Sequence, residues 1–337
     1  MSQPPLNNIA ILGSGICGLA AALSITFLPH PIPFTLYELR PVLSSIGGAV
    51  GLTPNALRYL DRLGVLSKLN GKKLGCETDG VEIFSIHSGR NMGEISFRGM
   101  ADGYKGRRVM RKDLLEGMLE TLQERMRDSG VGQVIYGKKA VALTEKGTQV
   151  EITFEDGTTA MGDMVLGCDG IHSVTRTAFV EPERTPEYSG IAAAYGIASA
   201  ENLTLPLHFD TSGVNSSRQG SLLTSFCDAD RKKMYVAAVM ETEEQFSREG
   251  WKAKGEDQEH VRKDIMNRFE GGVFPVVEEL IEKTEDWFLY PVYKLSPKGR
   301  WCKGRVMLLG DAAHAVSSTP LDHFRTRTDT VEDATAG

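Results

Sequence analysis

The sequence predicts an α/β fold in which a parallel sheet of the dinucleotide-binding type is combined with an antiparallel sheet. The first observation is a glycine-rich turn at residues 13–18, between a short apolar run and an Ala/Leu-rich segment. The second is a pair of apolar strand patterns, at 164–167 and 306–309, each followed within two residues by an aspartate. The third is a series of strand patterns between residues 186 and 298. Buried parallel strands alternating with helices, plus a separate strand-rich segment, are typical of two interleaved layers.

The glycine turn has the residue types that a bound pyrophosphate requires. Gly13 permits the tight turn, Gly15 lets the backbone approach the phosphates, and Gly18 lets helix and strand pack closely. A second strand pattern ends in Glu38, twenty positions after Gly18. A carboxylate at that position accepts hydrogen bonds from a ribose hydroxyl. The order of strand, turn, helix and strand therefore predicts a dinucleotide site.

Chain length, net charge and apolar pattern limit the classes of protein to which this chain can belong. A chain of 337 residues can bury a sizeable core and form one large or two interleaved domains. The net charge of −6, without a basic block, argues against nucleic acid as a partner. The apolar run 9–28 is interrupted by glycines and follows no basic residue, so we expect no membrane span.

The five cysteines indicate a reducing compartment, and we expect a cytoplasmic protein. They are scattered, without a Cys-x-x-Cys pair. They also lack the spacing of metal ligands, so no metal site is predicted.

The segment after Glu38 contains a second glycine-rich stretch. Arg40, which follows Glu38, and Gly51, which lies in this stretch, are candidate cofactor-binding residues. Thr53 is an expected N-cap with Pro54 at the first helical position, and Gly64 is an expected helix end.

Strand patterns at 80–97 precede a helical pattern at 114–122. Arg107, Arg108 and Arg111 come just before that helix. Cations at a helix start oppose the macrodipole, so we expect at least one of them to meet an anion.

The segment from 186 to 298 is predicted to be a second body built on an antiparallel sheet. Its expected strands cover 191–197, 205–209, 222–226 and 234–239, and its expected helices cover 243–251, 260–269 and 276–281.

Three further motifs agree with the turn. They follow the turn in sequence order, and they are Arg111 with Leu114, Asp169-Gly170 with Arg176, and Gly310-Asp311. Together the four motifs resemble the single-component FAD-dependent aromatic hydroxylases of the para-hydroxybenzoate and salicylate hydroxylase type, and most closely the fungal members. The resemblance covers most of the first 180 residues and about 300–314.

The resemblance implies a Rossmann-like FAD-binding domain (GR2-type) with an interleaved antiparallel-sheet substrate domain. The FAD-binding domain would comprise 1–75, 100–185 and 300–337, and the substrate domain 76–99 and 186–299. The residues that would bind FAD are Gly13, Gly15, Gly18, Glu38, Arg40, Gly51, Arg111, Asp169, Gly170, Asp311 and Ala312.

The resemblance also implies an activity. FAD is resident, whereas NADH or NADPH binds transiently and delivers a hydride. The reduced flavin reacts with O2 to give a C4a-hydroperoxide, which hydroxylates a small aromatic or polyketide-type substrate. The sheet at 186–298 would keep water from the flavin.

Catalytic candidates come from the strand patterns of the second body. His208 is a candidate base for activating a phenol, although a strand histidine is more often only hydrogen-bonded. Tyr195 is a second candidate, and Tyr235 is placed similarly.

The sequence departs from the family's pattern near its end. In the family, the Gly-Asp motif continues through a proline and several glycines into a helix whose positive end faces the flavin. Here residues 317–328 contain no glycine, and 331–334 resemble that helix again. We interpret this stretch as a locally altered reading frame or splice choice, and we expect a C-terminal truncation.

Two hypotheses of different classes follow. The first is an FAD-dependent monooxygenase. The second is a truncated FAD-fold protein without activity. Within the enzyme class, an epoxidase or a halogenase remains an alternative, although the tryptophans Trp251, Trp287 and Trp301 lie too far apart for the paired-tryptophan halogenase signature.

Overall fold

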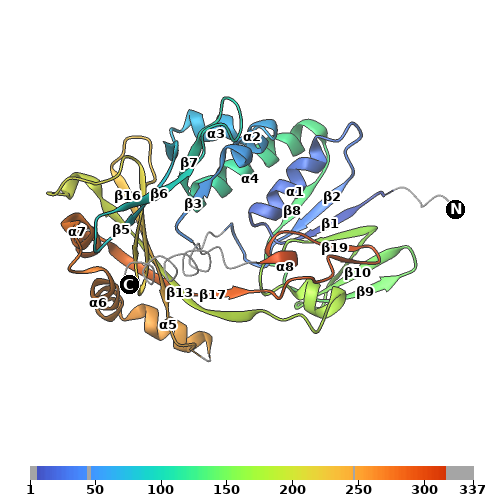
Figure 1. The fold of residues 1–337 in the computed structure, drawn as a ribbon. Coiled ribbons are helices and arrows are strands. Elements are labelled where there is room, and N and C mark those ends of the chain that lie inside the picture. The colour runs from blue at the N-terminus through green and yellow to red at the C-terminus, as the bar shows by residue number, and fades with distance from the viewer. Residues whose placement is uncertain (1–5, 44–46, 246, 316–337) are drawn as a thin grey trace.

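The computed structural model describes residues 6–43, 47–245 and 247–315, and within these ranges the strands form four sheets. Figure 1 shows the parallel sheet and its helices at one side and the largest sheet at the other. The combination of a parallel sheet with a large, mainly antiparallel sheet confirms the predicted α/β class.

The six-stranded sheet carries the glycine turn. Its order is β18 (Cys302–Lys303), β19 (Val306–Leu308), β12 (Met164–Gly167), β1 (Ile9–Leu12), β2 (Phe34–Tyr37) and β8 (Gln133–Ile135). All neighbours are parallel except β18 with β19. The expected strands at 9–12, 34–38 and 164–167 are therefore present, and the parallel pairing follows from their nearly continuous apolar sequences.

Helices cover one face of this sheet and a small antiparallel sheet covers the other. Successive side chains of β1 point to these two faces in turn. Ile9 and Ile11 of β1 pack in one core with helices α1 (Ile16–Thr26) and α4 (Arg111–Ser129). Ala10 and Leu12 pack in another core with a small antiparallel sheet. That sheet consists of β9 (Ala140–Lys146), β10 (Gln149–Phe154) and β11 (Thr159–Gly162).

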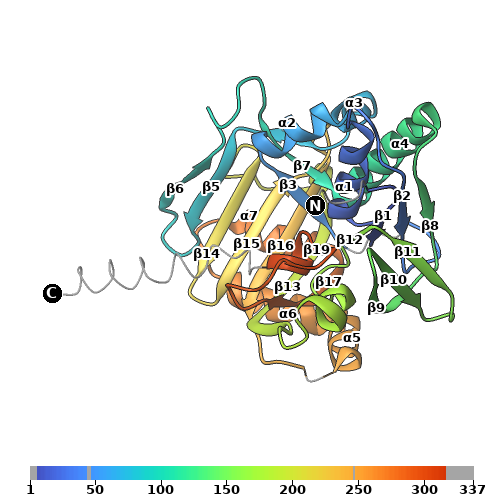
Figure 2. The ribbon, with the colours of Figure 1, turned by 90° about the vertical axis from the view of Figure 1, so that its right-hand side faces the viewer.

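The seven-stranded sheet forms the second body (Figure 2). Its order is β17 (Glu285–Lys294), β13 (Glu187–Ser199), β16 (Lys233–Glu241), β15 (Gly220–Phe226), β14 (Ser212–Ser217), β5 (Gly80–Ser85) and β6 (Asn91–Ser96). One face packs against α6 (Gln258–Phe269) and α7 (Pro275–Lys283), with α5 (Arg248–Glu256) beside them. The other face carries a small aromatic cluster that includes Tyr195 and Tyr235.

A three-stranded sheet lies between the two bodies. It contains β3 (Ala49–Leu52), β7 (Gly106–Met110) and β4 (Cys76–Thr78), and β7 runs directly into α4. Helices α2 (Pro54–Arg62) and α3 (Val65–Gly71) follow β3. Two short helical turns at Arg176–Val180 and Ala200–Asn202, and the four-residue helix α8 (Asp311–His314), complete the described elements.

The helix signals at α2 are confirmed. The Thr53 side chain accepts a hydrogen bond from the Ala56 backbone N–H at 3.4 Å, and Pro54 begins the helix. Gly64 follows the helix with φ of 78°, a left-handed conformation that glycine adopts without steric cost.

The strand expected at 205–209 is wrong. These residues are irregular, and the strand at this place in the sheet is β14, which begins at Ser212. Pro206 interrupts the expected strand because it has no N–H for a ladder bond. The helix expected from residue 243 begins only at Arg248, where the Ser247 side chain accepts from Gly250 N at 2.9 Å.

The arginines expected at a helix start are divided between two elements. Arg107 and Arg108 lie on β7, and only Arg111 begins α4. The domain division stays a prediction. Its boundary near residue 76 falls within a sheet, because β4 pairs with β7.

Among the described helices, none has both the length and the apolar character needed to cross a membrane.

We expect the helix layer over the seven-stranded sheet to contribute strongly to stability. Leu280 of α7 is fully buried in that core, so Leu280→Ala should lower the free energy of unfolding by about 2–5 kcal/mol. Leu205, 40% exposed, is the matched control, and Leu205→Ala should cost less than about 0.5 kcal/mol. Urea unfolding followed by circular dichroism measures both, and equal effects would contradict the assigned core.

Candidate functional site

The glycine turn is shaped by close backbone packing. Gly13 has φ of 103°, and a Cβ atom there would lie 2.6 Å from the carbonyl oxygen of Cys168. A Cβ atom at Gly18 would collide with the carbonyl oxygen of Gly13. At Gly15, by contrast, a Cβ atom would meet nothing within 4 Å. Packing therefore requires Gly13 and Gly18, whereas Gly15 opens onto free space.

The Glu38 carboxylate is joined to this turn. It is 8% exposed, and its Oε2 accepts hydrogen bonds from Ser14 N at 2.9 Å and Ser14 Oγ at 2.7 Å. Its Oε1 accepts from Arg40 N at 2.9 Å. Each carboxylate oxygen can accept more than one bond, so the group is held in place and still has acceptor capacity toward a ligand.

A cavity of about 870 Å³ lies beside the turn, and Gly13, Gly15, Glu38, Arg40 and Arg111 line it. Residues that follow two other strands complete the wall: Asp169 and Gly170 after β12, and Asp311 after β19. The cavity is thus at the carboxyl ends of parallel strands, where open α/β sheets bind ligands.

Two buried arginines hold the loops behind Asp169 and Asp311 together. Arg176 is fully buried and donates to the Ala312 carbonyl at 2.8 Å. Arg184, 6% exposed, donates to the Ala313 carbonyl at 2.9 Å. Carbonyl oxygens satisfy both buried guanidinium groups, so these arginines position the loops and are not free to bind a ligand.

The Asp169 carboxylate is also used within its loop. It accepts from Ser173 Oγ at 2.5 Å and from Thr175 N at 2.9 Å. This explains why an aspartate follows β12, since its carboxylate satisfies the backbone at the start of the next turn.

The cavity carries positive charges that sequence reasoning missed. Lys138, Lys139 and Arg248 line it together with Arg40 and Arg111. The two lysines follow β8, a parallel strand. Because open α/β sheets bind ligands at the carboxyl ends of such strands, their position in the sequence could have identified them. For Arg248, which starts α5 in the other body, the sequence contains no such signal.

A second cavity, of about 640 Å³, is aromatic on one side. Its aromatic lining residues are Tyr195 and Phe288, beside Gly47, Gly48 and Met110, and the rest of the lining is largely polar, with charged residues such as Lys233, Glu285 and Asp286. The Tyr195 ring stacks on Phe288 with centroids 5.4 Å apart and planes at 20°. A Cβ atom at Gly48 would lie 2.6 Å from the Tyr195 ring, so only glycine permits this approach.

Burial raises the pKa of Tyr195. Its ordinary value is already 10.0, so the side chain is a neutral phenol at physiological pH and can donate a hydrogen bond.

His208 lies elsewhere. Its Nε2 is 2.8 Å from Asn215 Oδ1, and its ring stacks on Phe274 at 3.7 Å. Phe274 packs against the core under α6 and α7, on the face opposite Tyr195. His208 is not among the lining residues of either cavity, and its role as a base stays a prediction.

Three predicted cofactor-binding residues do not line the large cavity. Gly18 packs against the backbone of Gly13 within the turn. Gly51 lines a third, smaller cavity beside Arg108. Ala312 is buried and acts through its carbonyl. The residues on which the expected truncation depends, 317–337, lie outside the described ranges.

No group of three or more His, Cys, Asp or Glu side chains in the described part of the chain could hold a metal ion.

The parallel sheet, the glycine turn and the long cavity define a dinucleotide-binding α/β protein. The chain belongs to the FAD binding domain family, whose model matches residues 7–320. FAD is its cofactor, and its class is that of flavoprotein monooxygenases.

The curated relatives are similar along most of the chain. It is 27% identical over 318 residues to 6-hydroxynicotinate 3-monooxygenase of Pseudomonas fluorescens, covering 93% of this chain and 77% of that protein. It is 30% identical over 317 residues to 3-amino-4-hydroxybenzoate 2-monooxygenase PtnB3 of Streptomyces platensis, covering 91% and 73%.

Solved structures share the fold. HpxO of Klebsiella pneumoniae in complex with FAD and uric acid has a TM-score of 0.73 at 24% identity, covering 93% of this chain and 74% of that one. A salicylate hydroxylase substrate complex has a TM-score of 0.73 at 23% identity, covering 94% and 75%.

The residues present fit FAD on structural grounds. The backbone at Gly15 is open toward the cavity, as a pyrophosphate requires, and the Glu38 carboxylate retains acceptor capacity. Arg40 and Arg111 supply positive charge along the same cavity. The individual roles of these residues remain proposals.

We expect Gly15→Ala to weaken FAD binding at least tenfold, because its methyl group would occupy the space proposed for the pyrophosphate. The thermal midpoint of the FAD-free protein should not change, since nothing in the protein lies within 4 Å of that methyl. Gly71→Ala is the control, because its Cβ is equally unobstructed, at the end of α3. Titration by FAD fluorescence measures the affinities. An unchanged dissociation constant in Gly15→Ala would contradict the assignment.

Proposed function

We propose that this protein uses NADH or NADPH and O2 to hydroxylate a small aromatic or polyketide-type substrate. One observation carries the proposal: the linings of the dinucleotide cavity and the aromatic cavity are in contact. Arg111 lines the first, Gly47 lines the second, and a Cβ atom at Gly47 would lie 2.9 Å from Arg111 Cδ. A flavin whose nucleotide end occupies the first cavity would present its ring toward the second.

Residues of the first cavity would bind the two ends of the nucleotide part of FAD. When bound, FAD supplies hydride acceptance and oxygen activation. The turn at Gly13–Gly18 and Glu38 bind the adenosine end, and Arg40 and Arg111 neutralise the diphosphate. Lys138 and Lys139 already form ion pairs with Asp156 and Glu155, each at 2.6 Å. The first cavity thereby anchors the cofactor.

The aromatic wall would exclude water and position the substrate. Tyr195 is 7% exposed and packs against Phe288, Tyr235 and Tyr290. Aromatic faces stack with an aromatic substrate, and a dry site reduces the loss of activated oxygen to hydrogen peroxide. Tyr195, as a neutral phenol, would donate a hydrogen bond that orients the ring.

The relatives support this class of substrate. Their names specify hydroxynicotinate and aminohydroxybenzoate, both aromatic rings that carry a hydroxyl group. All five cysteines are free thiols, which supports a cytoplasmic location.

The proposal is tested with purified protein loaded with FAD. We expect flavin absorption bands, NAD(P)H oxidation stimulated by a phenolic acid, and incorporation of one atom of ¹⁸O from ¹⁸O2 into the product. Absence of flavin bands after adding FAD would favour the inactive, truncated protein. Oxidation that yields only hydrogen peroxide across a panel of aromatics would contradict hydroxylation, and an epoxide product would identify the epoxidase alternative.

We expect Tyr195→Phe to retain FAD and to lower the hydroxylation rate about 3- to 10-fold, the effect of one lost hydrogen bond of about 0.5–1.5 kcal/mol. More NAD(P)H should then be consumed per product formed. Tyr59→Phe, at a 56% exposed position on α2, is the control and should change neither quantity. If Tyr195→Phe and the unmodified protein form the same amount of product per NAD(P)H consumed, Tyr195 has no role in the mechanism.

A further inference from the structure

Two cysteine thiols meet beside the glycine turn. Cys17 is the second residue of α1, and Cys168 directly follows β12. Their Sγ atoms are 3.9 Å apart, although the two residues are 151 positions apart in the chain. The parallel pairing of β1 with β12 brings them together.

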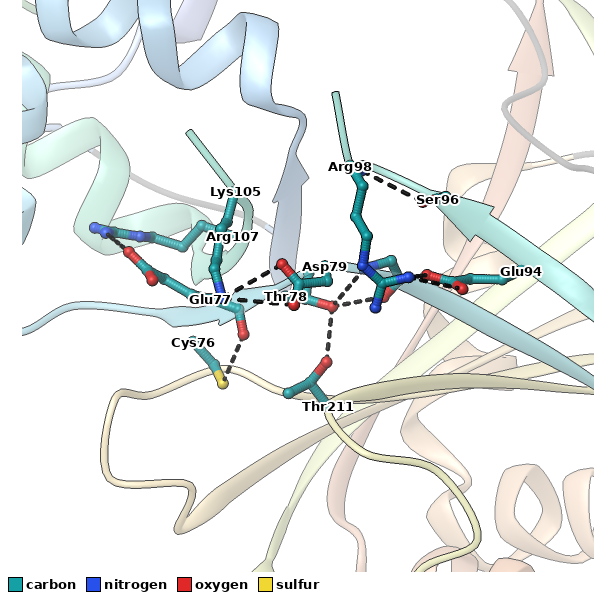
Figure 3. Close-up of polar contacts among 11 residues, drawn as sticks. Cys76, Glu77, Thr78, Asp79, Glu94, Ser96, Arg98, Lys105, Arg107 and Thr211 are labelled. Carbon is teal, nitrogen blue, oxygen red and sulfur yellow. Dashed lines mark hydrogen bonds and ion pairs between the residues drawn. The ribbon is translucent and has the colours of Figure 1, made fainter. Parts of the chain in front are cut away.

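Two other buried cysteines are hydrogen-bonded to the backbone instead. Cys76 Sγ donates to the carbonyl oxygen of Glu77 at 3.5 Å, as Figure 3 shows. Cys227 Sγ donates to the carbonyl oxygen of Lys233, also at 3.5 Å. Their protons are thus used within the fold, whereas the contact at the turn joins two thiols.

Both thiols of the pair border the cofactor cavity. Cys17 and Cys168 are lining residues of the cavity of about 870 Å³, together with Gly13 and Gly15. Cys17 is half-buried, and Cys168 is 7% exposed. A small solute in the cavity therefore reaches Cys17 first. A ligand that lies on the glycine turn would cover the same thiol.

The two thiols differ in acidity. The hydrogen bond with Cys168 lowers the pKa of Cys17, although burial and the Asp311 carboxylate act in the opposite direction. The same hydrogen bond, together with burial, raises the pKa of Cys168. Because the thiolate is the reactive form, Cys17 is the thiol that attacks an oxidant, and Cys168 is the neutral thiol beside it.

The backbone of Cys168 is fixed, so Cys17 must make the approach that an S–S bond requires. Cys168 N donates to the Leu12 carbonyl at 2.8 Å, and a Cβ atom at Gly13 would lie 2.6 Å from the Cys168 carbonyl oxygen. A disulfide has an S–S distance of about 2 Å, so the two sulfur atoms must come about 2 Å closer. This movement falls on the first turn of α1, whose N–H groups would bind the pyrophosphate of FAD.

We propose that Cys17 and Cys168 form a reversible disulfide when the cavity is empty, and that this disulfide and FAD exclude each other. The inference rests on the proposed FAD site in this cavity and does not depend on hydroxylation. In a reducing compartment such a disulfide is transient, as in redox sensors.

The oxidant in this reaction is a peroxide, and hydrogen peroxide is the simplest one. The Cys17 thiolate attacks one oxygen, the O–O bond breaks, and hydroxide leaves while Cys17 becomes a sulfenic acid. The Cys168 sulfur then attacks Cys17 Sγ, the S–O bond breaks, and water leaves with the Cys168 proton. In total, two thiols are oxidised by two electrons and hydrogen peroxide is reduced to two water molecules.

The test exposes FAD-free and FAD-loaded protein to the same dose of hydrogen peroxide without NAD(P)H. The remaining thiols are then alkylated, and peptides are mapped by mass spectrometry without reduction. We expect a linked peptide pair that contains Cys17 and Cys168 in the FAD-free protein. It should form at least tenfold more slowly in the FAD-loaded protein, and dithiothreitol should remove it.

Two variants identify the thiols that react. Cys17→Ser should abolish the linked pair. Cys302→Ser, which removes the exposed thiol of β18, is the matched control and should retain it. The thermal midpoint of the FAD-free protein should not fall on oxidation, because a cross-link restricts the unfolded chain. A lower midpoint would indicate oxidative damage and would overturn the proposal.

The effect on the cofactor is measured by FAD fluorescence titration. Oxidation should weaken FAD binding to the unmodified protein at least tenfold, and dithiothreitol should restore it. The affinity of Cys17→Ser should be the same before and after peroxide.

The contradicting outcomes are specific to the thiol pair. The proposal is overturned by the absence of the linked pair in FAD-free protein, by equal rates of linkage with and without FAD, or by an oxidised protein that binds FAD as before. Failure of the FAD site itself would appear separately, as an unchanged affinity in Gly15→Ala. Failure of hydroxylation would leave these results intact, because no step of the test involves turnover.

Discussion

The close approach of three backbone segments at the carboxyl edge of the parallel sheet is the constraint on which the rest of the structure depends. Gly13 lies against the backbone at Cys168, and Gly18 against Gly13 itself. A Cβ atom at Gly310 would lie 3.0 Å from Cys17 Sγ, so the third segment packs against a side chain at the start of α1. Motifs far apart in the chain meet here because β12 pairs with both β1 and β19.

Buried charge distinguishes scaffold from binding site in this protein. The guanidinium groups of Arg176 and Arg184 are satisfied by carbonyl oxygens. The two terminal nitrogens of Arg107 pair with a carboxylate and an amide, while its Nε has no partner. A buried charge costs free energy unless it is paired, so these partners explain how the fold accommodates the three arginines. Arg108, the neighbour of Arg107 on β7, is only half-buried and lines the small cavity beside Gly51.

Local signals in the sequence predicted local structure well. The strand at 9–12, the glycine turn and the cap at Thr53 depend on residues within a few positions of one another, and the structure confirms them. Predictions were less successful where distant segments compete for a place in a sheet. β14 took the place expected for 205–209, because a strand is stabilised by its neighbours as well as by its own residues.

The sequence by itself determined the α/β class, the cofactor and the family, because its motifs encode backbone geometry that only glycine and a few polar residues satisfy. Only the tertiary structure decided which face each candidate occupies. Alternation along a strand shows which residues share a face, but the partner of that face is set by packing between sheets. That packing placed Tyr195 on the wall of the second cavity, and it placed the half-buried His208 against Phe274 on the opposite face.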